Sequence, residues 1–120
     1  MVVKRLLEQK GCTVTVAENG NKGVDAFLRS AIDFYDGVLM DIRMPEMDGL
    51  EAARAIRSMK RPDAKTIPII AMTANAYAED IKLSLEAGMN AHLSKPIEPE
   101  LMYQTLSRLV HKKEILFSQK

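Results

Sequence analysis

The stretch Val38-Leu39-Met40-Asp41-Ile42-Arg43-Met44-Pro45-Glu46-Met47-Asp48-Gly49 decides the fold. It opens with a continuous apolar run, which is typical of a strand buried on both faces of a parallel sheet. Asp41 follows this run, and a proline and a glycine then turn the chain. Open α/β sheets bind ligands at the carboxyl ends of their strands, where an aspartate is able to act as a nucleophile toward phosphorus. The alternative interpretation is a strand-end aspartate that only caps a turn.

Helical and strand patterns alternate along the rest of the chain. Strand patterns are expected over residues 13–16, 38–41, 67–73 and 91–93, and helical periodicity over residues 1–10, 22–30, 50–59, 76–87 and 101–111. Strict alternation of this kind predicts a parallel sheet covered by helices. We therefore expect a three-layer α/β sandwich that forms one domain over residues 1–120.

Composition limits the classes of function. Lys and Arg exceed Asp and Glu by one (17 against 16), so no overall charge attracts nucleic acid or a membrane surface. The single cysteine, Cys12, excludes an internal disulfide and fits a reducing compartment. No apolar run approaches the roughly 18 residues of a membrane span. These features predict a cytoplasmic domain without nucleic-acid or membrane partners.

Two further strand ends carry side chains that suit a phosphorylated aspartate. Thr73 closes one strand pattern, and Lys95 follows the last one. Because the carboxyl ends of parallel strands share one edge of a sheet, we expect Asp41, Thr73 and Lys95 to converge. The lysine would supply a positive charge, and the threonine hydroxyl a hydrogen bond, to phosphoryl oxygens. Taken singly, each residue also fits an ordinary strand end.

Three motifs, at residues 40–49, 72–76 and 87–96, follow one another along the chain. Together they resemble the receiver domain of two-component response regulators, and most closely the receivers of hybrid sensor histidine kinases. The resemblance covers residues 1–110. It implies a flavodoxin-like (CheY-like) fold and a partner that is a histidine kinase or a phosphotransfer domain.

The resemblance also implies a role for individual residues. Asp41 is expected to be the phosphoacceptor, and Thr73 and Lys95 are expected to contact the phosphoryl group. Magnesium is the expected cofactor, with Asp41 and the backbone carbonyl of Arg43 as ligands. Beyond self-catalysed phosphorylation of the aspartate, no enzyme activity is expected.

The third motif contains two further positions with a specific expectation. His92 stands where the resemblance implies an aromatic residue that moves together with Thr73, so it is either a modified switch residue or a plain surface histidine. The Lys95–Pro96 bond is a candidate cis peptide that would aim the lysine inward, although most X–Pro bonds are trans.

One feature of the receiver pattern is missing. Receivers open with a central strand that ends in two acidic residues holding the magnesium, but here no Asp or Glu precedes Glu8. Residues 115–117 are a candidate replacement strand, supplied by the same chain or swapped from a partner in a homodimer. The alternative is that residues 111–120 form a frayed tail. A replacement strand would put Ser118 and Gln119 where carboxylates are expected, so magnesium binding would be weak.

Three functions remain open on these observations. The first is a phosphoacceptor receiver that takes a phosphoryl group onto Asp41 and switches protein contacts. The second is a degenerate receiver that binds partners without phosphorylation, which the missing acidic pair favours. The third is an aspartyl-nucleophile phosphohydrolase, which needs a second acidic residue as acid or base close to the nucleophile.

Overall fold

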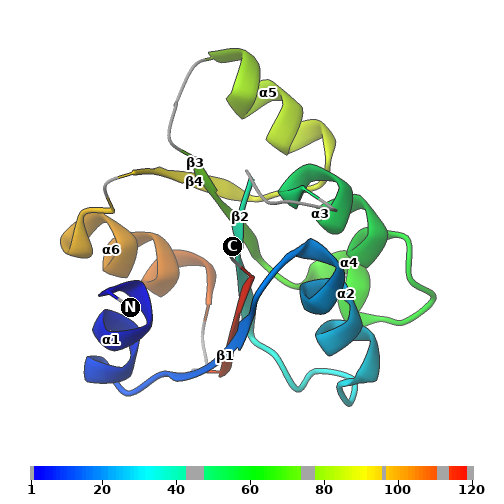
Figure 1. Cartoon of the computed structure of the whole chain (residues 1–120), viewed down its shortest axis with the longest axis horizontal. Coiled ribbons are helices and arrows are strands. Elements are labelled where there is room, and N and C mark those ends of the chain that lie inside the picture. Colours follow the sequence, from blue (N-terminus) through cyan, green and yellow to red (C-terminus); the bar gives the residue numbers. More distant parts are fainter. Residues whose placement is uncertain (1, 43–47, 74–77, 96, 111–113, 119–120) are drawn as a thin grey trace.

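Strands and helices alternate through the chain, as shown in the computed structural model (Figure 1). The structure describes residues 2–42, 48–73, 78–95, 97–110 and 114–118. The strands are β1 (Thr13–Ala17), β2 (Gly37–Asp41), β3 (Ile69–Thr73), β4 (Ala91–Ser94) and β5 (Glu114–Ser118). The helices are α1 (Val2–Gln9), α2 (Gly20–Arg29), α3 (Gly49–Arg57), α4 (Asp63–Thr66), α5 (Ala78–Glu86) and α6 (Pro99–Leu109). Every helix and strand that the sequence patterns predicted is present, and the short α4 is an addition.

All five strands pair in parallel, in the order β1-β5-β2-β3-β4. The last strand of the described chain therefore lies in the interior of the sheet, between β1 and β2 (Figure 1). Its central residue Leu116 is level with Thr15 on one side and with Val38 on the other. This arrangement confirms the flavodoxin-like fold and the replacement of the central strand by the carboxyl-terminal segment.

The interpretation of residues 111–120 as a frayed tail is therefore wrong for residues 114–118. The replacement strand is longer than the expected residues 115–117, and it pairs with β1 and β2 of its own chain. The apolar triplet explains why the segment docks, because Ile115, Leu116 and Phe117 are each at most 1% exposed. Leaving three large apolar side chains in water would cost several kcal/mol, at about 1.5–3 kcal/mol for each.

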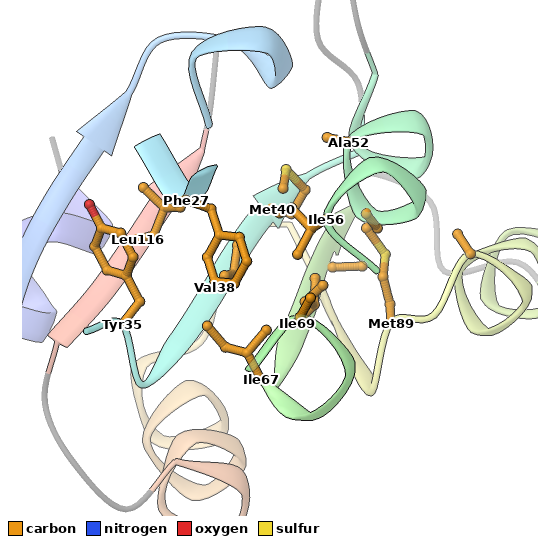
Figure 2. Close-up of a cluster of buried hydrophobic side chains, with 14 of the residues drawn as sticks. Phe27, Tyr35, Val38, Met40, Ala52, Ile56, Ile67, Ile69, Met89 and Leu116 are labelled. Atoms are coloured by element: carbon orange, nitrogen blue, oxygen red, sulfur yellow. The ribbon is translucent and has the colours of Figure 1, made fainter. Parts of the chain in front are cut away.

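The side chains of the sheet fill two cores, one on each face. On one face, Leu116 of β5 and Val38 of β2 pack with Phe27 of α2 and Ile56 of α3 (Figure 2). The other core lies under α1 and α6 and contains Leu7, Leu39, Ile70, Met102, Ile115 and Phe117. Because successive residues of β5 point to opposite faces, this one strand contributes to both cores.

Specific polar contacts fix both ends of β5. At its start, the Asp36 carboxylate accepts a hydrogen bond from the Glu114 N–H at 2.9 Å, and the Asp36 N–H donates to the Glu114 carbonyl at 2.8 Å. At its end, the Ser118 hydroxyl donates to the Asn19 carbonyl at 3.0 Å. Gly23 makes this approach feasible, because a Cβ at Gly23 would lie 2.5 Å from the Ser118 oxygen. These contacts fix the register of β5 and also hold the strand in the sheet.

A buried ion pair between Arg61 and Asp63 lies at the start of α4, and Arg61 connects this helix to α2. Arg61 donates to both carboxylate oxygens of Asp63, at 2.6 and 2.9 Å, and to the carbonyl of Phe27 at 2.8 Å. Its guanidinium also lies over the Phe27 ring, 4.5 Å from the centroid. The hydrogen bond from Arg61 holds the pKa of Asp63 below its usual value.

Among the described residues, no helix has both the length and the apolar character that crossing a membrane requires.

Candidate functional site

The carboxyl ends of three neighbouring strands bring the predicted site residues together. Asp41 is the last residue of β2 and Thr73 the last residue of β3, while Lys95 directly follows β4. Asp41 is level with Met72, so Thr73 stands one residue further along the adjacent strand. The Lys95 N–H donates to the Thr73 carbonyl at 2.7 Å, which fixes the lysine backbone against β3. The strand ends that carry the three residues therefore lie side by side at one edge of the sheet.

The Lys95 ammonium forms an ion pair with the Asp41 carboxylate, with Nζ 2.6 Å from Oδ2. The Asp41 side chain is 10% exposed and the Lys95 side chain 39% exposed. The carboxylate is thus largely buried, while the lysine that reaches it is partly exposed. A charge-assisted bond of this length in a partly buried place is stronger than a surface ion pair.

The start of α3 lies directly against the end of β2. The Gly49 N–H donates to the Ile42 carbonyl at 2.9 Å. A Cβ at Gly49 would collide with the Asp41 carbonyl oxygen, so this position requires glycine. Asp48 caps α3, because its side chain accepts from the Glu51 N–H at 2.9 Å. The predicted metal ligand Arg43 lies outside the described residues.

His92 and the Lys95–Pro96 bond complete the predicted positions. His92 lies on β4, level with Ala71, and is half-buried. Its position on the strand next to β3 is compatible with a switch residue and equally with a structural one. Pro96 lies outside the described residues, so the cis peptide stays a prediction.

The described residues do not by themselves fit a magnesium site. They contain no group of three or more His, Cys, Asp or Glu side chains that could hold a metal ion. Of the carboxylates near this edge, Asp41 faces Lys95, Asp48 caps α3, and Glu18 pairs with Lys22, which lowers the pKa of Glu18. Magnesium needs several oxygen ligands in octahedral geometry.

Ser118 is the last residue of β5. It is level with Met40, one residue before Asp41, and its hydroxyl donates to the Asn19 carbonyl. It is fully buried and forms part of the strand anchor. Gln119, the other residue expected in place of a carboxylate, lies outside the described residues.

Sequence reasoning missed two residues, Asn19 and Asp36, that anchor the ends of β5. Asn19 is the N-cap of α2, and its side chain accepts from the Lys22 N–H at 2.8 Å. An Asn directly before a helical pattern is a capping signal that would have predicted this role. The pairing of Asp36 with Glu114 has no comparable signal, because 78 residues separate the two.

The site can hold a negatively charged group next to Asp41. A carboxylate at the carboxyl edge of a parallel sheet stands where such sheets bind ligands. Lys95 would balance added negative charge there, and the Thr73 side chain carries a hydroxyl at the end of the adjacent strand. Among the described residues within four positions of Asp41, there is no second acidic residue of the kind that a phosphohydrolase needs.

Known proteins of similar sequence indicate the family of the chain. Residues 1–107 match the model of the response regulator receiver domain. The chain is 38% identical over 113 residues to hybrid signal transduction histidine kinase I of Dictyostelium discoideum, an alignment that covers 92% of the chain and 6% of that protein. It is 37% identical over 107 residues to the sensor protein GacS of Pseudomonas syringae pv. syringae, covering 88% of the chain and 12% of that protein.

Solved structures agree with the sequence matches. The receiver domain of the sensor histidine kinase PA1611 from Pseudomonas aeruginosa superposes with a TM-score of 0.80 at 37% identity, covering 90% of this chain and 84% of that one. That crystal structure has a magnesium ion coordinated in its active site cleft. The chain spans only 6% and 12% of the length of the two curated relatives above, so their whole activities are not transferred to it. By its family match, its relatives and its fold, this chain belongs to the response regulator receiver domains of two-component systems.

Proposed function

We propose that the chain is a phosphoacceptor receiver, in which Asp41 takes a phosphoryl group from a histidine of a kinase or of a phosphotransfer domain. The observation that carries the proposal is the ion pair between Asp41 and Lys95 at the carboxyl edge of the sheet, with Thr73 at the end of the strand between them. The relative from Dictyostelium discoideum is a hybrid signal transduction histidine kinase, which supports a phosphohistidine donor.

In the proposed transfer, an Asp41 carboxylate oxygen attacks the phosphorus of the phosphohistidine. The P–O bond to Asp41 forms as the P–N bond breaks, and the departing imidazole nitrogen takes up a proton from solvent. Lys95 remains beside the new acyl phosphate and offsets its negative charge. The Thr73 hydroxyl donates to a phosphoryl oxygen, which draws the end of β3 toward the site. We propose that this movement changes the protein contacts of the domain, with His92 on the neighbouring strand as a further switch residue.

We propose that magnesium binds weakly to this 120-residue chain, with Asp41 and the Arg43 carbonyl as its ligands. The described carboxylates near this edge support the proposal, because each already has a partner. Asp41 pairs with Lys95, Asp48 caps α3 and Glu18 pairs with Lys22. When bound, the ion would supply positive charge at the phosphoryl group.

The competing function is a degenerate receiver that binds partners without phosphorylation. The poor set of metal ligands among the described residues favours it, and the short Asp41–Lys95 ion pair opposes it. The two functions differ in one property, which is whether Asp41 responds to a phosphoryl group.

Beryllofluoride, which mimics a phosphoryl group on an aspartate, distinguishes the two. We expect saturable changes in the amide NMR signals of Thr73 and Lys95 when beryllofluoride and magnesium are added to the folded chain. The Asp41→Asn variant is the control and should show no change. A folded wild-type chain that does not respond at millimolar magnesium would support the binding module instead.

A further inference from the structure

Exposed apolar side chains gather in one short segment between α2 and β2. Leu28 is 58% exposed, Ile32 is 55% exposed and Phe34 is 47% exposed. These are three of the five large apolar side chains that are exposed among the described residues, and a single stretch, residues 28–34, carries all three. We call the side chains of Leu28, Ile32 and Phe34 the apolar patch.

A single buried guanidinium folds this segment into a compact turn. Arg61 donates to the carbonyl of Leu28 at 3.3 Å and to the carbonyl of Ala31 at 3.0 Å. The Phe34 N–H donates to the same Ala31 carbonyl at 3.0 Å. The residues of the apolar patch are therefore held close together, and contiguous exposed apolar patches commonly mark interaction sites.

Asp33, in the middle of the turn, is fixed in an unusual conformation. Its φ is 65°, in the left-handed region that few residues other than Gly, Asn and Asp adopt. Its N–H donates to the Asp63 carboxylate at 2.8 Å, and Arg61 binds the same carboxylate. The turn is thus ordered before any partner arrives, which lowers the entropy cost of binding.

A cavity of about 250 Å³ adjoins the apolar patch. Asp33 and Tyr35 belong to its wall, and the Phe34 ring contacts the Tyr35 ring edge to face, with 4.9 Å between the centroids. Three carboxylates line the cavity, those of Asp33, Asp36 and Asp63, while none of its described lining residues is Lys, Arg or His. We call this space the acidic cavity.

Two of the three carboxylates are not balanced by a described cation. Arg61 pairs with Asp63, with Nε 2.6 Å from Oδ1. The Asp36 carboxylate accepts from the Glu114 N–H, which carries no net charge. Neither Asp33 nor Asp36 forms an ion pair within the part of the chain that the structure describes. The acidic cavity therefore attracts a cation from outside.

This negative charge decides between the possible occupants of the surface. Pairing of the patch with the same patch of a second copy would bring like-charged carboxylates together, which disfavours association. An anionic lipid surface would be repelled in the same way. A protein segment that carries Lys or Arg beside apolar side chains complements both the patch and the cavity.

We propose that the apolar patch and the acidic cavity form one docking site for a partner protein segment in which a Lys or Arg stands between apolar residues. The apolar side chains of the segment pack on Ile32 and Phe34. Its cationic side chain enters the acidic cavity and lies beside the carboxylates of Asp33 and Asp36.

The docking site lies away from Asp41. Asp36 and Pro68, both in the wall of the cavity, directly precede β2 and β3, whereas Asp41 is the last residue of β2. In Figure 1 the segment between α2 and β2 lies at the bottom of the molecule and α5 at the top. Docking here therefore does not depend on the phosphoacceptor proposal.

A peptide titration tests the docking site. The probe is a helical peptide of Leu, Ala and Lys, and its control has Glu at every Lys position. We expect the Lys peptide to shift the amide NMR signals of Ile32, Asp33 and Phe34 saturably, and to bind about tenfold more tightly than the Glu peptide. Equal affinities, shifts confined to other parts of the chain, or no shift at millimolar peptide would overturn the proposal.

Two variants remove the parts of the site separately. Asp33→Asn removes one charge but keeps a residue that tolerates positive φ, and Phe34→Ser removes part of the apolar patch. Each should weaken binding of the Lys peptide by about tenfold. Leu85→Ser is the matched control, because Leu85 is 58% exposed on α5, and it should leave the affinity unchanged. Wild-type affinity in Asp33→Asn or in Phe34→Ser would contradict the docking site.

Light scattering and vesicle sedimentation test the other occupants. We expect the molar mass of the chain and its binding to phosphatidylserine vesicles to be the same in wild type and in Phe34→Ser. A wild-type dimer that Phe34→Ser dissociates would assign the patch to a second copy. Vesicle binding that Phe34→Ser abolishes would assign it to a membrane. Either result would overturn the proposal.

Discussion

The Lys95 ammonium lies 2.6 Å from the Asp41 carboxylate, although 54 residues separate the two in the chain. The pair exists because β2 and β4 end on the same edge of the sheet, on either side of β3. Lys95 is held twice, by this ion pair and by its N–H bond to the Thr73 carbonyl. The geometry of the site is therefore a property of the sheet rather than of any single loop.

Replacing the lysine tests its role at the site. Lys95→Met keeps the apolar stem and removes the charge beside Asp41. Because charge-assisted hydrogen bonds contribute about 1.5–3 kcal/mol, we expect beryllofluoride affinity to fall by roughly ten- to hundredfold. Isothermal titration measures the affinity. Lys60→Met, at an exposed position, should leave it unchanged, and equal affinities in the two variants would show that Lys95 does not contact the phosphoryl group.

Shortening the Leu116 side chain tests whether β5 is docked in solution. Leu116 is fully buried between α2 and the sheet, so Leu116→Ala should lower the free energy of unfolding by about 2–5 kcal/mol. Leu101→Ala is the matched control, because Leu101 is 48% exposed on α6 and its loss should cost less than about 0.5 kcal/mol. Urea denaturation followed by circular dichroism gives both values. Similar small losses in the two variants would mean that residues 114–118 do not occupy the slot.

A double-mutant cycle tests the seat of Ser118. A Cβ at Gly23 would lie 2.5 Å from the Ser118 oxygen, so Gly23→Ala should destabilise the fold by about 1–3 kcal/mol through overpacking. Ser118→Gly removes the clashing atoms together with the bond to the Asn19 carbonyl. The double variant should lose less stability than the sum of the two single losses, because the clash between Gly23→Ala and the Ser118 side chain is absent from it. Strict additivity would place the end of β5 away from Gly23.

The ion pair between Arg61 and Asp63 predicts how the free energy of unfolding depends on pH. The hydrogen bond from Arg61 lowers the pKa of Asp63 in the folded chain. Asp63 therefore contributes its full share to the stability of the fold above the pKa that it has in the unfolded chain. That contribution is lost as the pH falls through the lower, folded pKa. Asp63→Asn should therefore cost about 3 kcal/mol at neutral pH, and the difference from wild type should shrink below about pH 4.

Thermal denaturation across this pH range measures the effect. Asp25→Asn is the control, because Asp25 pairs with Arg29 on the surface of α2, where ion pairs contribute little. A difference between wild type and Asp63→Asn that stays constant from pH 7 to the acid limit would contradict the assignment.

The sequence was sufficient for the parallel sheet and for the meeting, at one edge, of the strand ends that carry Asp41, Thr73 and Lys95. Continuous apolar runs before Asp41 and Thr73 locate two buried strands, and parallel topology then places their ends together. The position of β5 was harder, because a short apolar segment after the last helix fits a tail and a strand equally well. What decides between them is the gap that β1 and β2 would leave in the sheet without β5, and this gap is a property of the whole fold. Asp36 and Gly23 contact β5 across long stretches of sequence and carry no local signal for doing so.

The most direct test of the phosphoacceptor proposal is an intact-mass measurement after incubation with a small acyl phosphate donor and magnesium. We expect the addition of one phosphoryl group to the wild-type chain, its removal by hydroxylamine, and no addition to Asp41→Asn. Unchanged mass of the folded wild-type chain, or phosphorylation that persists in Asp41→Asn, would contradict the claim that Asp41 is the phosphoacceptor.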